Sequence, residues 1–219
     1  MNALQKRDAA VPTVASLHPD WRKAWGRTIE GADLRAALEA NPRLQSRILG
    51  AIGKAHGRTL RSDPRLDETS LRVAKALGAD RDGFVRLCGL AHIGRRIAMA
   101  TNPDDYTVLS RAFGGERLAA AVRIAAALPG GAGEHGYDSE QLVPAVERTG
   151  RAVLASWVAT LPAEAADWMT MLLPPSEEGG LVATARAVAI VEGAADHWTP
   201  PAEGSEARTE RTSRRRRAA

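Results

Sequence analysis

The chain has 219 residues, 44% hydrophobic and 26% charged, which is enough for a sizeable folded core. Its single cysteine, Cys88, excludes an internal disulfide framework and a cysteine-rich zinc site. The last 20 residues hold six arginines and three glutamates and account for +3 of the net charge of +4, so the charge does not indicate a basic folded surface.

Composition favours an all-α protein. Alanine and leucine, which favour helices, are abundant, aromatic residues make up only 4%, and β-branched alternation is almost absent. We therefore predict a single compact domain of about nine to ten helices. Its predicted boundaries are a flexible segment at 1–14, a helical domain at 15–198 and a disordered arginine-rich tail at 199–219.

No run of about 18 consecutive apolar residues occurs, so no membrane span is expected. The first residues, MNALQKRDAAVP, lack the apolar core of a signal peptide. Together with the lone cysteine in an apolar run, these features predict a cytoplasmic protein.

The ordered part is predicted to start at Leu17-His18-Pro19-Asp20-Trp21. Pro19 can begin a short helix, because a proline at the first helical position loses no hydrogen bond. Gly26 would end this helix, and the spacing places Trp21 and Trp25 on one face.

Two further helices are expected before residue 60. Residues 32–40 form an apolar pattern through Leu34, Ala37 and Leu38. Pro42 is predicted to open the next helix, up to residue 53. Its expected inner face consists of Leu44, Ile48, Leu49 and Ile52.

A helix over 67–77 is predicted to stop at Gly78, followed by three consecutive helices within 82–128. Asn102 and Pro103 would start the second of these three, and Gly114 would end it in a left-handed conformation. The first of the three has a wide apolar face made of Phe84, Leu87, Cys88, Leu90, Ala91, Ile93, Ile97 and Ala98. The third should bury Leu118, Ala121, Val122, Ile124, Ala125 and Leu128.

The four glycines within 129–140 predict a loop. The next helix would be capped by Asp138 or Ser139, with Pro144 bending or restarting it. Its expected apolar face consists of Val146, Val153, Leu154, Trp157, Val158 and Leu161. Two more helices, at 163–173 and 181–191, would bury Trp168, Met171 and Leu172, and Leu181, Val188 and Val191.

Residue patterns for chemistry are weak, and no catalytic, cofactor or metal site is predicted. Cys88 and His92 could meet on one helix face, but a thiolate–imidazole pair needs a third group and a cleft, so core packing is favoured. The glycine-rich loop at 130–136 has no preceding strand and no following lysine, unlike a phosphate-binding loop. The five histidines are scattered.

Four residues are candidates for partner binding. Arg95 and Arg96 are adjacent, so they cannot share one helix face, and at least one should reach solvent or an acidic partner. Trp157 and Trp168 flank a proline turn and could anchor a partner, although burial in the core is the default interpretation.

The segment TGRAVLASWVATLPAEAADWMTMLLPP resembles the carboxyl-terminal part of the YscK/SctK family of type III secretion sorting-platform proteins. The run LCGLAHIGRRIAMA followed by YTVLSRAFGGERLAAAV is similar to the middle region of that family, and Leu17, His18, Pro19 and Trp21 to the start of its ordered part. The resemblance covers about residues 15–195 and leaves the arginine-rich tail without a counterpart.

The resemblance implies a helical, non-catalytic adaptor, cytoplasmic and held at the inner membrane through the secretion apparatus. Its implied partners are the inner-membrane ring protein (SctD-like) and the pod protein (SctQ-like), and indirectly the stator and the ATPase. Two alternatives remain. One is a helical nucleic-acid-binding regulator that uses Arg214–Arg217, and the other is a small enzyme that uses Cys88 and His92.

Overall fold

The computed structural model describes residues 13–26, 32–41, 43–61, 64–99, 103–128, 139–175 and 182–199. Within these ranges the chain forms nine α-helices, one short 3-10 helix and no strand, so the predicted all-α fold is confirmed. The elements are η1 (Val14–Ser16), α1 (Pro19–Gly26), α2 (Ala32–Ala40), α3 (Gln45–Ala55), α4 (Glu68–Met99), α5 (Pro103–Phe113), α6 (Gly115–Ala127), α7 (Ser139–Val158), α8 (Ala163–Leu172) and α9 (Thr184–His197).

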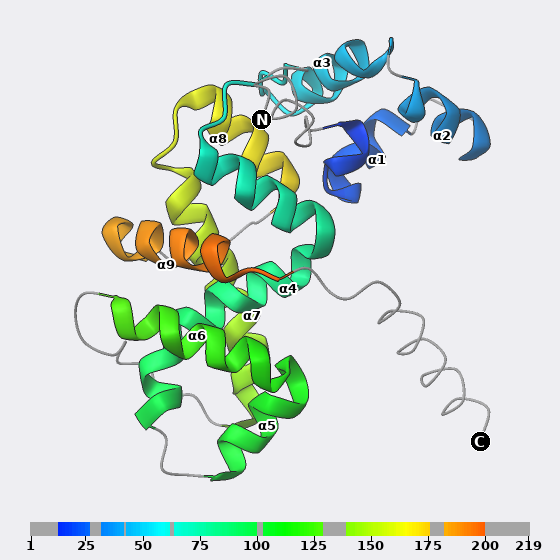
Figure 1. The fold of residues 1–219 in the computed structure, drawn as a ribbon. Helices are drawn as coiled ribbons and strands as arrows, with labels where there is room; N and C mark the ends of the chain where they lie inside the picture. The colour runs from blue at the N-terminus through cyan, green and yellow to red at the C-terminus, as the bar shows by residue number, and fades with distance from the viewer. Residues whose placement is uncertain are drawn as a thin grey trace, which may run out of the picture.

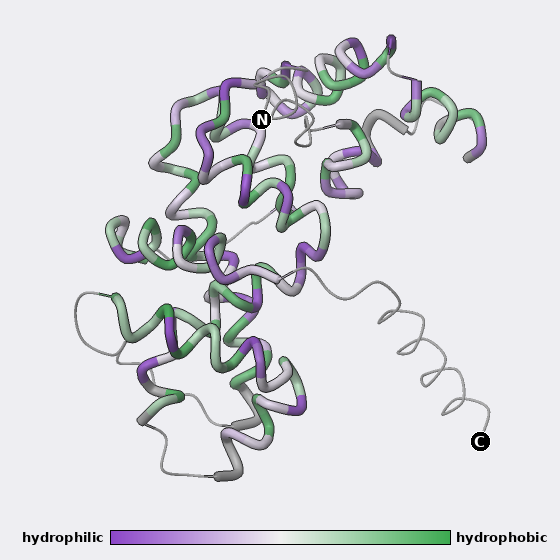
Figure 2. Tube along the Cα trace, viewed as in Figure 1, coloured by the Kyte–Doolittle hydropathy of each residue, from purple (hydrophilic) through white to green (hydrophobic). Residues whose placement is uncertain are grey.

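Helix α4 is the axis of the molecule and packs against α6, α7, α8 and α9 (Figure 1). Helices α1 to α3 lie at one end, near α8, and α5 and α6 lie at the other end (Figure 1). Hydrophilic and hydrophobic stretches alternate along the helices, as expected when each helix buries one face (Figure 2).

Two hydrophobic clusters hold the fold together. The larger one is built mainly from α4, α6, α7 and α9 and includes Phe84, Leu118 and Trp157. The smaller one joins η1 and α3 to α8, whose Trp168 and Met171 contribute side chains to it. Helix α8 thus serves both clusters, because its Met169 and Leu172 belong to the larger one.

Helices α4 and α7 cross in backbone contact at two glycines. A Cβ atom added to Gly89 would lie 2.0 Å from the carbonyl oxygen of Val146, and one added to Gly150 would lie 2.0 Å from that of Val85. The two contacts are reciprocal, so each helix supplies the glycine that accepts the backbone of the other. Only glycine permits this approach, because any larger residue would push the helices apart.

Glycines of α4 and α9 also allow close contact with side chains of α6. A Cβ atom on Gly94 of α4 would lie 2.6 Å from the Cβ atom of Ala125, and one on Gly193 of α9 would lie 2.9 Å from Ile124. Glycines therefore set the spacing between α6 and both α4 and α9.

Helix α4 bends at Asp80, whose backbone (φ −154°, ψ 88°) is not helical. The Asp80 carboxylate accepts the Gly83 N–H at 2.8 Å and so caps the second segment of the helix. It also pairs with Arg117 of α6 at 2.7 Å, and the Arg117 guanidinium lies 5.7 Å from the centre of the Trp198 ring. The predicted stop at Gly78 is wrong, because the helix continues through Gly78 and breaks two residues later.

Other boundaries also differ from the prediction. Helix α3 begins at Gln45, after a turn in which the Asn41 side chain accepts the Arg43 N–H, so it does not start at Pro42. Helix α7 runs through Pro144 without a break. Helix α9 begins and ends later than expected, and Trp198 follows it directly.

Three residues predicted to face the core are exposed: Leu34, Ala37 and Ala98. Helix α2, which contains Leu34 and Ala37, lies at the edge of the molecule, where η1 and α3 pack against it and Arg22 of α1 pairs with its Glu39 (Figure 1). By contrast, the predicted positive φ of Gly114 is confirmed at +85°. No helix in the described part of the chain is long and apolar enough to cross a membrane.

Replacing Gly89 with alanine should lower the free energy of unfolding by about 1–3 kcal/mol or more, because the new methyl group meets backbone that cannot move aside. The matched control is Gly78→Ala in the same helix, where a Cβ atom meets nothing within 4 Å. The control should raise stability by about 0.5–1 kcal/mol. Thermal unfolding followed by circular dichroism measures both, and equal stability of the two variants would contradict the backbone contact.

Candidate interaction site at the end of helix α8

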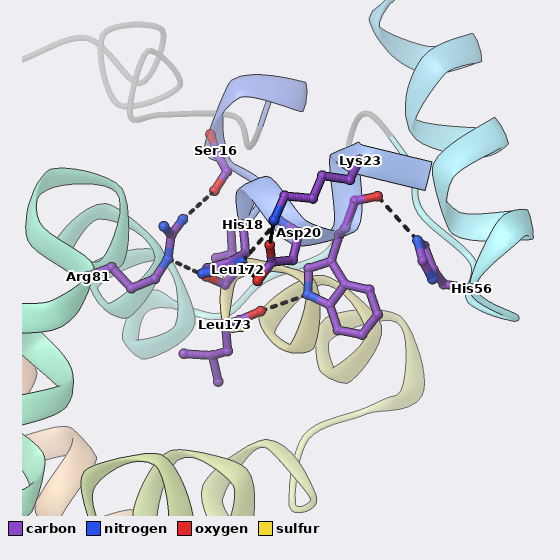
Figure 3. A network of polar contacts seen from close by, with 9 residues as sticks. Ser16, His18, Asp20, Lys23, His56, Arg81, Leu172 and Leu173 are labelled. Carbon is purple, nitrogen blue, oxygen red and sulfur yellow. Dashed lines mark hydrogen bonds and ion pairs between the residues drawn. The ribbon is translucent and has the colours of Figure 1, made fainter. Parts of the chain in front are cut away.

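The carboxyl end of α8 is the place where the amino-terminal helices meet α4 (Figure 3). A helix leaves its last carbonyls without partners inside the helix. Three donors bind consecutive carbonyls here: His18 N–H to Met171 (2.9 Å), Arg81 Nε to Leu172 (2.6 Å) and Trp21 Nε1 to Leu173 (2.7 Å). We name this group of contacts the α8 joint.

Arg81 is the central residue of the α8 joint. It directly follows the bend at Asp80, and its Nη2 atom also donates to the carbonyl of Ser16 at 3.2 Å. One side chain therefore connects α4, α8 and η1 (Figure 3). Burial lowers the pKa of this guanidinium from its ordinary value, but arginine stays charged. Its positive charge lies at the negative end of the α8 dipole.

His18 caps helix α1 from the other side of the joint. Its Nδ1 atom accepts the Asp20 N–H at 3.2 Å, so the ring is neutral at this nitrogen. Burial, and after it the charge of Arg81, lower the pKa of His18 below its ordinary value. The Asp20 carboxylate pairs in turn with Lys23.

Two further residues of α8, Asp167 and Trp168, bind the segment that follows α3. Trp168 is fully buried, and its Nε1 atom donates to the carbonyl of Arg61 at 2.9 Å. The neighbouring Asp167 accepts from Arg58 at 2.9 Å and from the Thr59 N–H at 3.0 Å. Helix α8 thus holds the chain that leaves α3 as well as the chain that enters α1.

The α8 joint is suited to holding two helical units in one orientation. His18 Nδ1, the Arg81 guanidinium and the Trp21 indole each bind a backbone group of the protein itself. A general base or a nucleophile must face a substrate, whereas these three side chains are hydrogen-bonded to the backbone. The arrangement is mechanical, since it fixes the position of the amino-terminal helices relative to α4.

The four predicted partner-binding residues do not form one site. Arg95 binds the carboxyl end of α6, with Nε 3.3 Å from the Ala125 carbonyl and Nη2 2.6 Å from the Leu128 carbonyl. Trp157 is 3% exposed in the larger cluster, and Trp168 belongs to the smaller one. Burial of both rings agrees with the default interpretation of core packing. The side chain of Arg96 lies outside the described residues.

Cys88 is fully buried, and burial raises the pKa of its thiol. This position agrees with the interpretation of Cys88 as a core residue, because a reactive thiolate needs exposure and a lowered pKa. No group of three potential metal ligands occurs in the part of the chain that the structure describes. The glycine-rich loop at 130–136 and the arginines at 214–217 lie outside the described residues.

Sequence reasoning missed Arg81 as a structural residue. Its acceptors at Leu172 and Ser16 lie 91 and 65 positions away, so spacing along the chain carried no signal for them. The sequence predicts that the Leu-His-Pro-Asp-Trp segment starts the ordered part and a short helix, but it does not indicate that His18 and Trp21 bind the end of α8.

Comparisons with protein-family models, with curated proteins and with solved structures gave no match to this chain.

Replacing Arg81 with methionine keeps most of the apolar stem and removes the donors to the carbonyls of Leu172 and Ser16. The loss should lower the free energy of unfolding by about 1–3 kcal/mol, because buried acceptors lose their partners. The matched control is Arg72→Met, which removes an exposed ion pair with Asp196 and should cost about 0–1 kcal/mol. Urea denaturation measures both variants, and a smaller loss for Arg81→Met would contradict the role of the joint.

Stability should fall in mild acid because His18 is held neutral. Its pKa in the folded state lies below the ordinary value of 6.5, so the unfolded chain binds the proton more readily. The contribution is therefore present above pH 6.5 and is lost progressively as the pH falls from there through the lower folded-state pKa of His18. Asp20 and Lys23 on α1, and Arg81 and Asp82 on α4, are the charged groups that influence it.

The variant His18→Asn tests this, because the asparagine oxygen can replace Nδ1 as the helix cap and does not titrate. The variant should lose less stability than the parent protein between about pH 7.5 and about pH 5.5. Urea denaturation at both pH values gives the difference. An equal loss in both proteins would show that other groups cause the pH dependence.

Proposed function

We propose that this chain is a non-catalytic, cytosolic adaptor of a bacterial type III secretion sorting platform. In this role it links the cytoplasmic domain of the inner-membrane ring protein to the pod protein. Its location would be peripheral to the inner membrane through these contacts. The proposal starts from the resemblance of the central and carboxyl-terminal segments to the YscK/SctK family and gains support from the shape of the molecule.

The observation that carries the proposal is that exposed apolar side chains occur at two separate places on the surface, one on α2 and one on α5. Leu34 on α2 is 55% exposed, and Tyr106 and Val108 on α5 are 51% and 38% exposed. Helices α2 and α5 lie at opposite ends of the molecule (Figure 1). Helix α4, which bends at Asp80, lies between these ends (Figure 1). An adaptor for two partners needs two such surfaces that are held apart.

Ion pairs between the helices of the protein also favour an adaptor. Four arginines on three helices form ion pairs with acids of other helices: Arg22–Glu39, Arg72–Asp196, Arg86–Glu147 and Arg117–Asp80. These pairs fix helices relative to each other instead of lining a cavity. The nucleic-acid alternative depends on the tail, which lies outside the described residues, and the enzyme alternative depends on Cys88, which is buried.

The proposal predicts that the purified chain forms a ternary complex with the ring protein's cytoplasmic domain and the pod protein of the same bacterium. The three should co-elute in size-exclusion chromatography, and leaving out this chain should separate the other two. Binding of neither purified protein at micromolar concentration would refute the adaptor role.

Surface variants at the two ends should then weaken different partners. Leu34→Ser on α2 should reduce binding of one partner, and Tyr106→Ser with Val108→Ser on α5 should reduce binding of the other. The single variant on α2 and the double variant on α5 serve as controls for each other. All three residues are exposed, so their replacement should leave the fold intact. Loss of the same partner in both cases would contradict a bridge with two ends.

A further inference from the structure

The outer side of α3 carries positive charge that no ion pair among the described residues neutralises. Arg47 and Lys54 lie seven residues apart, with Gly50 and Ala51 between them, and all four are exposed. Spacings of three, four and seven residues place them on one face of the helix. The buried residues Ile48, Leu49 and Ile52 occupy the opposite side. We name the exposed set Arg47, Gly50, Ala51 and Lys54 the α3 face.

Two acids of the described elements around α3, Glu39 and Asp167, are already bound by other arginines. Residues 41–61 contain five arginines and lysines and no aspartate or glutamate. Glu39, which precedes this stretch, pairs with Arg22 at 3.0 Å, and Asp167 of α8 pairs with Arg58 at 2.9 Å. Within the described residues, Arg47 and Lys54 take part in no ion pair. The positive field of the α3 face is therefore directed outward.

Gly50 is a glycine that internal packing does not explain. A Cβ atom at Gly50 would meet nothing within 4 Å, whereas one at Gly53 in the same helix would lie 2.7 Å from the carbonyl oxygen of Arg58. Glycine weakens an exposed helix relative to alanine, so folding alone gives no reason for it here. Its effect is to leave, together with Ala51, a low apolar floor between two cations.

Such a surface fits an acidic polypeptide. The cations lie about 10 Å apart along the helix, which is the distance between side chains two turns apart on a second helix. A small apolar floor flanked by charges matches a protein interface, with an apolar centre and a polar rim. Single-stranded nucleic acid would instead use aromatic side chains for stacking, and the four residues of this face include none.

We propose that the α3 face is a docking surface for an acidic helical segment of a partner protein. Aspartate or glutamate of that segment pairs with Arg47 and Lys54, and its small or apolar residues pack over Gly50 and Ala51. This inference goes beyond the proposed function, because it holds for a partner in any assembly.

The test uses the full chain labelled with ¹⁵N and an alanine-based helical peptide of about 20 residues with glutamates two turns apart. Amide signals of residues 47–54 should shift in a saturable way, and about 0.5 M salt should abolish the shifts because exposed ion pairs are screened. A lysine-substituted version of the peptide should cause no shifts.

Two variants of equal size separate docking from folding. Gly50→Leu fills the floor of the α3 face and should weaken peptide binding at least about tenfold, because the peptide can no longer approach the helix. Gly78→Leu on α4 also enters open space and should bind like the parent. Circular dichroism should show both variants to be folded. Arg47→Glu should abolish binding regardless of the floor.

Duplex DNA and vesicles containing phosphatidylserine serve as competing probes. Tighter binding of either one at the same residues would overturn the assignment of a protein partner. Absence of shifts with the acidic peptide, or equal binding by Gly50→Leu and the parent, would overturn the proposal. These outcomes are independent of whether the secretion-system proteins bind.

Discussion

The backbone contact between α4 and α7 at Gly89 and Gly150 is the constraint on which the other contacts depend. Two helices that touch at glycine have little freedom to slide, because the neighbouring side chains interlock on both sides. This crossing fixes the second segment of α4, which follows the bend at Asp80 and carries Gly89. Arg86 and Glu147 pair across the same crossing at 2.7 Å.

The bend at Asp80 transmits that constraint to the amino-terminal helices. Asp80 holds α6 through Arg117, and the next residue, Arg81, reaches the end of α8. One turn of chain thus connects the larger cluster with the smaller one. Two carbonyls at the end of α8, those of Met171 and Leu173, accept hydrogen bonds from His18 and Trp21 in the segment of η1 and α1. The order in the amino-terminal part is therefore coupled to the order of the bundle.

Local signals in the sequence predicted much of the fold, and non-local contacts account for what it did not predict. Pro19, Gly26 and Pro162 mark helix limits that the structure confirms, because proline and glycine act on their own backbone. Gly78 failed as a stop signal because glycine only permits the left-handed turn, and here the chain stays helical until Asp80. Leu34 failed because helical periodicity shows which face is apolar but not whether another element covers it.

The candidate site residues show the same difference between local sequence signals and non-local contacts. Arg95 was selected as a surface contact because adjacent arginines must point apart, yet it binds the end of α6, a partner 30 residues away. Arg81 and Arg95 perform the same task at two helix ends, and neither role follows from its neighbours in sequence. These two arginines donate hydrogen bonds to the last carbonyls of another helix and so have a structural role. Arg47 and Lys54 of α3 make no such contact among the described residues, and a Cβ atom at Gly50 between them would meet nothing within 4 Å, so this part of α3 is not explained by the internal architecture.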